Sequence, residues 1–367
     1  MQVFRILAAT VLVILCAASC GENTEGEGKS IDNFDRQLML EHWADDIIIP
    51  AFANYRSSTD ELLTATDIFI GDKSAASLEA LRASWRDTYH AWQMVAMYNI
   101  GPAEQMQLAN TTNVYPTNVA LIESNSQLES IDPELPSNRP AIGYPAIEYL
   151  IYGDADLSSA EVIDQLQDDK RANHLRALVQ ILADDAALVH DQWTTEYRDV
   201  FVQADGSSAT ASVNKMTNDY IYYFEKQLRA NKVGIPTGWF STEPLPQNVE
   251  GLHAGDISKT LLIAALDAFQ SFFNGQYLND TDKGEGFASY LNYLGNNNSL
   301  EVDINAQLNA ARAIALTLDD SFERQIATDN TKMLQLYDEL QKAVVLLKVD
   351  MMQALNIKVD YVDADGD

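Results

Sequence analysis

One carboxylate, Glu148, stands in a stretch of the sequence that carries almost no other charge. Between Arg139 and Asp154 it is the only acidic residue, and its neighbours are tyrosine, isoleucine, leucine and alanine. Such a setting predicts burial, and burial raises the pKa of a carboxyl group unless a cation or a hydrogen-bond donor compensates its charge. We therefore expect Glu148 to need a partner, and the direction of its pKa shift to report what that partner is.

Several partners are open to Glu148. A purely structural role would satisfy it with the guanidinium of Arg86, a tyrosine hydroxyl or N–H groups at a helix end, although Arg86 is equally consistent with a solvated side chain. A functional role would place a ligand or a metal ion beside it. Tyr115 and Pro116 belong to the long irregular connection that leads to Gly143, so we expect them near the same cleft.

A second candidate pair is Glu250 and His253, which have the i,i+3 spacing of a carboxylate and an imidazole on one helical face. Gly251 and Gly255 argue against a helix at this point. If these side chains joined a metal site, carboxylate oxygens would suit Fe³⁺ or Ca²⁺, and the imidazole would shift the preference towards Zn²⁺ or Fe²⁺.

The known hydrolytic motifs are missing from the sequence. There is no His-Glu pair, so the His-Glu-x-x-His helix of a zinc peptidase does not occur, and neither Gly-x-Ser-x-Gly nor a Walker phosphate loop is present. The formal net charge of -30 also makes nucleic-acid binding unfavourable, because the surface repels phosphate backbones. That charge suits either cationic ligands or simply the solubility of an envelope protein.

The elements that must position these residues are helices. Apolar residues recur at helical spacing through most of the chain, while the alternation typical of strands is scarce. Around Glu148 we expect a short helix that starts at Pro145 and ends at Gly153. We predict an all-α fold of two helical bundles in tandem, residues 32–204 and 205–359, with a cleft between them and an acidic tail over 360–367.

The beginning of the chain predicts export. Residues 1–19 contain a short basic start and an apolar run too short to span a bilayer, which is typical of a signal peptide. Small residues precede Cys20, so we expect a lipoprotein processing site, with acyl chains on Cys20 that anchor the protein in the lipid bilayer. Residues 20–31 are rich in glycine and glutamate and would form a flexible tether.

The segment Gly143-Tyr-Pro-Ala-Ile-Glu148 resembles the GxHxxE motif of the imelysin-like family, also described as peptidase M75. Gly143 and Glu148 match the motif, whereas Pro145 stands in place of the histidine and cannot ligate a metal. Further segments resemble the family in the same order along the chain. They are Asp46–Phe52, Ser84–Arg86 and the connection from Lys232 to Gly238, which reads Lys-x-Gly-x-Pro-x-Gly.

The resemblance implies a protein of the bacterial cell envelope, anchored by lipid in the outer membrane, with a role in the acquisition of iron or another divalent or trivalent metal. Its ligand site would lie in the cleft around Glu148, with Arg86, Tyr115, Glu250 and His253 as further candidates. Two alternatives stay open at this point. One is an M75-type metallopeptidase, and the other is a structural lipoprotein without metal that binds a partner such as an envelope transporter.

Overall fold

The structure is a computed structural model that describes residues 32–154, 157–277, 283–295 and 299–361. The predicted signal peptide, Cys20 and the tether lie outside the described residues, as does the tail beyond residue 361. No helix in the described part of the chain is long and apolar enough to cross a membrane.

Every regular element in these ranges is helical, which confirms the predicted all-α class. Labels with η mark 3₁₀-helical or π-helical segments. The elements are α1 Arg36–His42, η1 Trp43–Ile48, α2 Ile49–Asp72, α3 Ala75–Val95, α4 Pro102–Gln105, α5 Leu108–Thr112, α6 Val119–Asn125, η2 Pro136–Ala141, α7 Gly143–Tyr152, α8 Ser159–Gln165, α9 Asp169–Gln192, η3 Trp193–Tyr197, α10 Arg198–Gln203, α11 Ser212–Tyr222, η4 Tyr223–Gly234, α12 Ile235–Thr237, η5 Pro246–Asn248, α13 Ser258–Phe273, α14 Phe287–Leu294, α15 Leu300–Ala315, α16 Phe322–Val345, η6 Leu346–Met351 and α17 Met352–Ala354.

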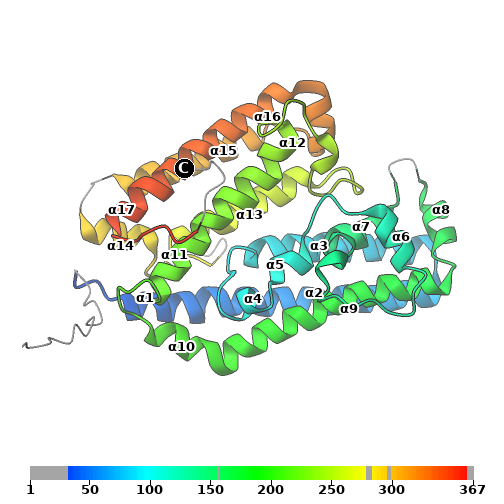
Figure 1. The fold of residues 1–367 in the computed structure, drawn as a ribbon, viewed down its shortest axis with the longest axis horizontal. Helices are drawn as coiled ribbons and strands as arrows, with labels where there is room; N and C mark the ends of the chain where they lie inside the picture. Colours follow the sequence, from blue (N-terminus) through cyan, green and yellow to red (C-terminus); the bar gives the residue numbers. More distant parts are fainter. Residues whose placement is uncertain (1–31, 155–156, 278–282, 296–298, 362–367) are drawn as a thin grey trace, which may run out of the picture.

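The helices form two stacked groups (Figure 1). In one group α2 packs against α3 and α9, and in the other α15 and α16 pack with α13 and η4. Contacts between α3 and α13 join the two groups. The predicted boundary at 204/205 falls between α10 and α11, and the division of the chain there stays a prediction.

The buried apolar side chains form one continuous core that spans both groups. Aromatic rings supply much of the connection: the ring of Trp43 in η1 lies 4.9 Å from that of Phe272 in α13. Contacts of this kind stabilise a fold by about 0.5–1.5 kcal/mol each beyond the burial of their area. The position of α3 relative to α13, and hence of everything between them, is therefore set by packing on both sides.

Prolines follow two of the π-helical segments. A proline has no N–H with which to close an i→i−4 hydrogen bond, so a helix must change its bonding pattern around it. The sequence predicts a kink at Pro50, and the structure places the π-helical η1 directly before it, with Pro50 in the first turn of α2. In the same way Pro236 follows η4, in the first turn of α12.

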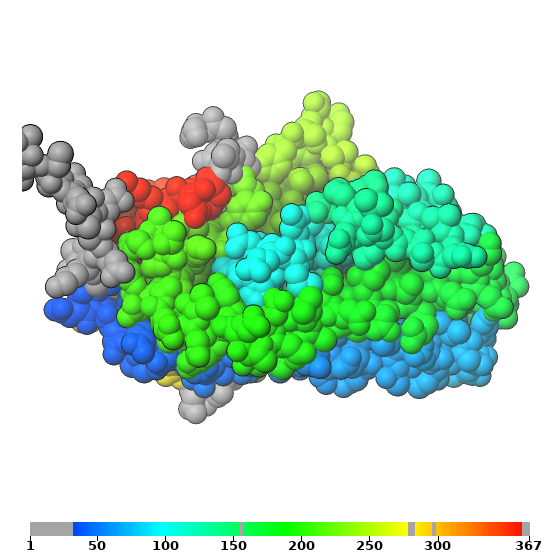
Figure 2. Space-filling view, turned by 60° about the horizontal axis from the view of Figure 1, so that its bottom comes forward, coloured from blue at the N-terminus to red at the C-terminus, as the bar shows by residue number. Residues whose placement is uncertain are grey.

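The segment between α3 and α9 covers one side of the first group. Figure 2 shows residues from about 100 to 150, coloured cyan to teal, above the green surface of α9 and the blue surface of α2. Within this segment α7 contacts α3, α6 and α9. Helix α7 is thus enclosed, which explains why nearly every residue from Gly143 to Ile151 is apolar or aromatic.

Candidate functional site

Helix α7 begins at Gly143, two residues earlier than the predicted start at Pro145. Gly143 has a φ of +74°, which only glycine adopts without strain, and a Cβ at this position would overlap the carbonyl oxygen of Thr112. Pro145 lies inside the first turn, where its missing N–H leaves no hydrogen bond unmade. The predicted end at Gly153 is confirmed, because Gly153 has a φ of +75° and follows Tyr152 directly.

Glu148 is buried, with 1% of its surface exposed, as the sequence predicts. Its Oε1 accepts a hydrogen bond of 2.8 Å from the backbone N–H of Ala254, and the backbone N–H of His253 is a second donor. Burial raises the pKa of Glu148 to about 8, against the pull of these two N–H groups. The carboxyl group is therefore mostly protonated at neutral pH.

Glu148 faces a cavity of about 290 Å³. Tyr115, which the sequence places near Glu148, lines it, together with Pro145 of the motif. The opposite wall comes from the segment that runs from Gln247 to His253. Most of the lining is apolar or aromatic, and the remaining polar members are Asp154, Gln247, Glu148, His253 and Thr117. The cavity thus lies between residues on either side of the predicted boundary at 204/205, and it has the size and mixed lining of a small-molecule site.

Arg86, one of the partners that the sequence left open for Glu148, binds other residues instead. The Arg86 guanidinium forms an ion pair of 2.7 Å with Asp256 and donates a hydrogen bond of 2.8 Å to the hydroxyl of Tyr152. Arg86 acts on Glu148 only through space, as one of the weaker influences that lower the carboxyl pKa. Asp256 is half-exposed and lies within ion-pair distance of Arg86, whereas Glu148 is buried with its own backbone donors.

Glu250 and His253 do not share a helical face, because the residues between them form turns. Gly251 and Gly255 have φ values of +76° and +75°, which break any helix. His253 lines the cavity of Glu148, its ring packs edge-on against Tyr149, and burial lowers its pKa, so the imidazole is neutral. Glu250 is directed elsewhere, and it does not line this cavity.

Glu250 instead forms a buried ion pair with Lys232 at the end of η4. Its Oε1 accepts hydrogen bonds of 3.1 Å from Gln93 and 2.7 Å from Asn113. Lys232 also donates to the Oε1 atom of Gln93, at 2.8 Å. The two candidate acids of the sequence therefore belong to two adjacent but separate environments.

The residues around Glu148 do not fit a metal ion. The carboxylate is held by N–H groups, which are donors where a metal would need lone pairs, and proline occupies the position of the motif histidine. His253 Nδ1 lies 4.0 Å from Asp154, and a backbone hydrogen bond to Gly153 occupies the ring. Across the described residues, no three histidine, cysteine or acidic side chains are grouped so that they could hold a metal.

The sequence did not identify Ala254, Lys232, Gln93 or Asn113 as contributors to these environments. Ala254 acts through its backbone N–H, for which the sequence contains no signal beyond the glycines that shape the turn around it. Lys232 is the first residue of the Lys-x-Gly-x-Pro-x-Gly segment, but the sequence does not show which residue it contacts.

The comparisons with known proteins agree with one another. The family model of imelysin, peptidase M75, matches residues 48–349. An imelysin-like protein from Psychrobacter arcticum 273-4 superposes with a TM-score of 0.69 at 20% identity, over 89% of this chain and 97% of that one. A protein named iron-regulated protein A precursor, from Parabacteroides distasonis ATCC 8503, superposes with a TM-score of 0.72 at 14% identity, over 86% of this chain and 95% of that one.

A search of curated proteins gives no match. The family model covers most of the chain and includes both Glu148 and Glu250. The solved structures share the fold across nearly their whole length. The chain therefore belongs to the imelysin family, peptidase M75.

Proposed function

We propose that this protein is a binding protein of the bacterial cell envelope that assists iron acquisition, and that it holds an uncharged organic ligand, not a bare metal ion, beside Glu148. Family membership and the name of the Parabacteroides distasonis protein support the link to iron. The missing His-Glu-x-x-His motif and the poor fit of the site to a metal weigh against a metallopeptidase.

One observation carries the proposal: a protonated carboxyl group is held in place at the wall of a cavity of about 290 Å³. Oε1 of Glu148 is fixed by the N–H of Ala254, so the protonated group has one O–H to donate to a ligand. Apolar neighbours such as Val119, Val249 and Leu252 would contact the body of that ligand. A neutral molecule with a hydrogen-bond acceptor matches this lining better than a cation does.

The anchor and the partner are part of the same proposal. Acylation of Cys20 would tie the protein to the outer membrane, and residues 20–31 would let the folded part reach a transporter of the envelope. The net charge of -30 supports partners other than nucleic acid.

The test compares two replacements of Glu148 in a strain that lacks the gene and grows under iron limitation. Glutamine copies the protonated carboxyl group, since it keeps an acceptor for Ala254 and an N–H donor for the ligand, whereas alanine removes both. We expect the wild type and Glu148→Gln to restore growth and Glu148→Ala to fail. Cys20→Ala should lower the restored growth, because it removes the anchor.

Calorimetric titration of the purified variants with Fe²⁺, Fe³⁺ and Zn²⁺ completes the test. The proposal expects the heat of metal binding to be the same for the wild type and for both Glu148 variants. The opposite result is metal binding by the wild type that is lost in both Glu148→Gln and Glu148→Ala, with neither variant restoring growth. That result would establish a metal site in place of the proposed site for a neutral ligand. Normal growth of the deletion strain under iron limitation would contradict the proposed role in iron acquisition.

A further inference from the structure

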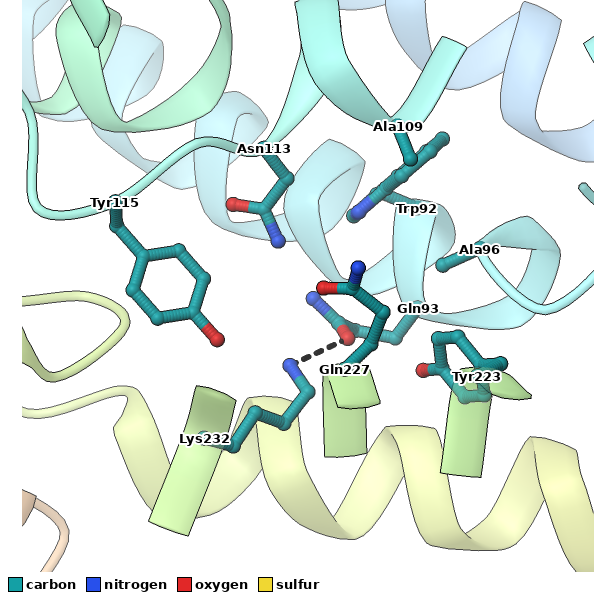
Figure 3. A pocket seen from close by; sticks show the side chains of 9 residues that line it. All are labelled: Trp92, Gln93, Ala96, Ala109, Asn113, Tyr115, Tyr223, Gln227 and Lys232. Atoms are coloured by element: carbon teal, nitrogen blue, oxygen red, sulfur yellow. Dashed lines mark hydrogen bonds between the residues drawn. The ribbon is translucent and has the colours of Figure 1, made fainter. Parts of the chain in front are cut away.

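A second, smaller cavity of about 20 Å³ lies next to the cavity of Glu148, and Tyr115 lines both. It has room for one group of about the size of a water molecule. Figure 3 shows Lys232, Gln227 and Tyr223 of η4 on one side, with Trp92 and Gln93 of α3 and Asn113 opposite. This cavity is separate from the site of the proposed function, since Glu148 and His253 are absent from its walls.

The π-helical form of η4 is what places its three side chains together. Tyr223, Gln227 and Lys232 are four and nine residues apart. In an α-helix, at about 100° per residue, positions nine apart point in roughly opposite directions. With the i→i+5 repeat of a π-helix, positions four or five and nine residues later return to the same face. The wall of the cavity thus depends on the 12 π-helical residues of η4.

The acceptors around the cavity are already used. Gln93 Oε1 accepts from Lys232, and Asn113 Oδ1 accepts a hydrogen bond of 2.6 Å from Tyr89. Gln227 Oε1 accepts one of 2.7 Å from Asn231. The Glu250 carboxylate, which does not line the cavity, accepts hydrogen bonds from Gln93, Asn113 and Lys232. Apart from the hydroxyl oxygens of Tyr115 and Tyr223, a bound molecule would therefore find few acceptors for a hydrogen bond.

The donors, in contrast, are in surplus. Tyr223 is 4% exposed, and its hydroxyl has no hydrogen-bond partner in the described residues. Trp92, whose indole carries one N–H, and the Nε2-bearing side chain of Gln227 also line the cavity, and Lys232 has a third N–H beyond its two bonds. An unpaired buried hydroxyl such as that of Tyr223 costs about 1–3 kcal/mol, which an acceptor in the cavity would offset.

The geometry points to a binding site for a small monovalent anion, a halide or the carboxylate end of a small organic acid, held by Tyr223, Gln227, Trp92 and Lys232. Only an acceptor-rich species satisfies four converging donors at once, and a single atom or a single carboxylate oxygen fits the space. The ion pair of Lys232 with Glu250 keeps the site close to neutral before the anion arrives. Such a site stands out on a chain whose net charge is -30.

The test titrates the purified protein calorimetrically with sodium bromide and sodium formate, at constant ionic strength maintained with sodium sulfate, an anion too large for the cavity. We expect saturable binding of at least one of the two small anions, and the stronger of them identifies the halide or the carboxylate class. Tyr223→Phe and Gln227→Leu should each weaken that binding by about tenfold or more, the loss expected for one buried hydrogen bond to a charged group.

Matched controls separate this site from the rest of the molecule. Tyr222→Phe changes the neighbouring residue, which is exposed, and should leave anion binding unchanged. Glu148→Gln should also leave it unchanged, so a failure of the proposed function does not affect this result. Tyr223→Phe should fold at least as well as the wild type in anion-free buffer, because it removes an unpaired hydroxyl. Absence of saturable binding, with water as the only occupant, or equal binding by Tyr223→Phe, would overturn the proposal.

Discussion

Glu148 and Glu250 are two buried glutamates, with 1% and 2% of their surfaces exposed, and Glu148 lines a cavity whereas Glu250 does not. Glu148 receives only backbone N–H groups, and burial raises its pKa to about 8. Glu250 receives a lysine ammonium and two amides. The charge of Glu250 also contributes to the raised pKa of Glu148.

The difference between them shows what it takes to bury a charge. Backbone dipoles offset only part of the desolvation of a carboxylate, so Glu148 gives up its charge instead. A full positive charge with well-placed hydrogen bonds allows Glu250 to remain in an ion pair. One glutamate is thereby able to donate a hydrogen bond, and the other is held in a buried ion pair.

The largest effect should come from removing the cation of Glu250. Lys232→Met leaves a buried carboxylate with amide donors alone, and we expect the free energy of unfolding to fall by about 3–5 kcal/mol in urea at pH 7. The double variant Lys232→Met, Glu250→Gln removes both charges and should recover most of that loss. Equal stability of the wild type and Lys232→Met would mean that the ion pair contributes nothing.

Next in size is a pH dependence that belongs to Glu148. The folded state keeps its proton up to about pH 8, whereas the ordinary pKa of an exposed glutamate is 4.5. The protonated form therefore supports full stability below pH 4.5, and this support is lost as the pH rises towards 8 and beyond. Glu148→Gln should abolish that loss, a difference of a few kcal/mol at pH 8.5.

The measurement is urea unfolding of the wild type and of Glu148→Gln at intervals from pH 5 to pH 8.5. Asp185 and Asp219 also have raised pKa values, to about 6 and 7, mainly through burial, and they lower stability over the same range in both proteins. Only the difference between the two curves reports Glu148. Parallel curves would show that Glu148 is ionised in the folded protein.

A smaller effect is expected from the backbone that holds Glu148. Gly143→Ala forces a Cβ into the carbonyl of Thr112 at a φ of +74°, and should cost about 1–3 kcal/mol. Gly206→Ala is the control, because a Cβ there has nothing within 4 Å. If Gly143→Ala disturbs only the surroundings of Glu148, it should alter the pH dependence of stability. The loss of stability caused by Lys232→Met should then be the same with and without Gly143→Ala.

The smallest effect concerns Arg86. Arg86→Met removes a half-exposed ion pair with Asp256, and stability should change by less than about 1 kcal/mol. Because the Arg86 charge lowers the pKa of Glu148, that pKa should rise further in the variant. A carboxyl ¹³C NMR titration of Glu148 measures the shift, and a fall in its pKa would show that Arg86 acts in another way.

The sequence predicted the parts of this arrangement that depend on local pattern. An apolar run around a single acid predicted that Glu148 is buried, and the position of Gly153 predicted where α7 ends. Helical periodicity predicted the all-α fold. Tyr115 was placed correctly because the chain that carries it leads directly to Gly143.

The failures all involve partners that are distant in the sequence or that act through the backbone. Arg86 pairs with Asp256, which no local pattern connects to it. Ala254 binds Glu148 with an N–H group that every residue except proline has. Lys232 faces Glu250 because η4 is π-helical, and a pattern interpreted at 3.6 residues per turn places Lys232 on a different face.

The tight turn from Glu250 to Gly255 touches both glutamates, since it starts with one and supplies Ala254 to the other. It is closed by a hydrogen bond of 3.1 Å from Gly255 to Gly251, so its ends do not move independently. Occupation of one cavity should therefore alter the affinity of the other, and thermodynamic reciprocity requires an equal factor in both directions. The six residues of the turn would then transmit the effect of a ligand in one cavity to the affinity of the other, without any movement of the surrounding helices.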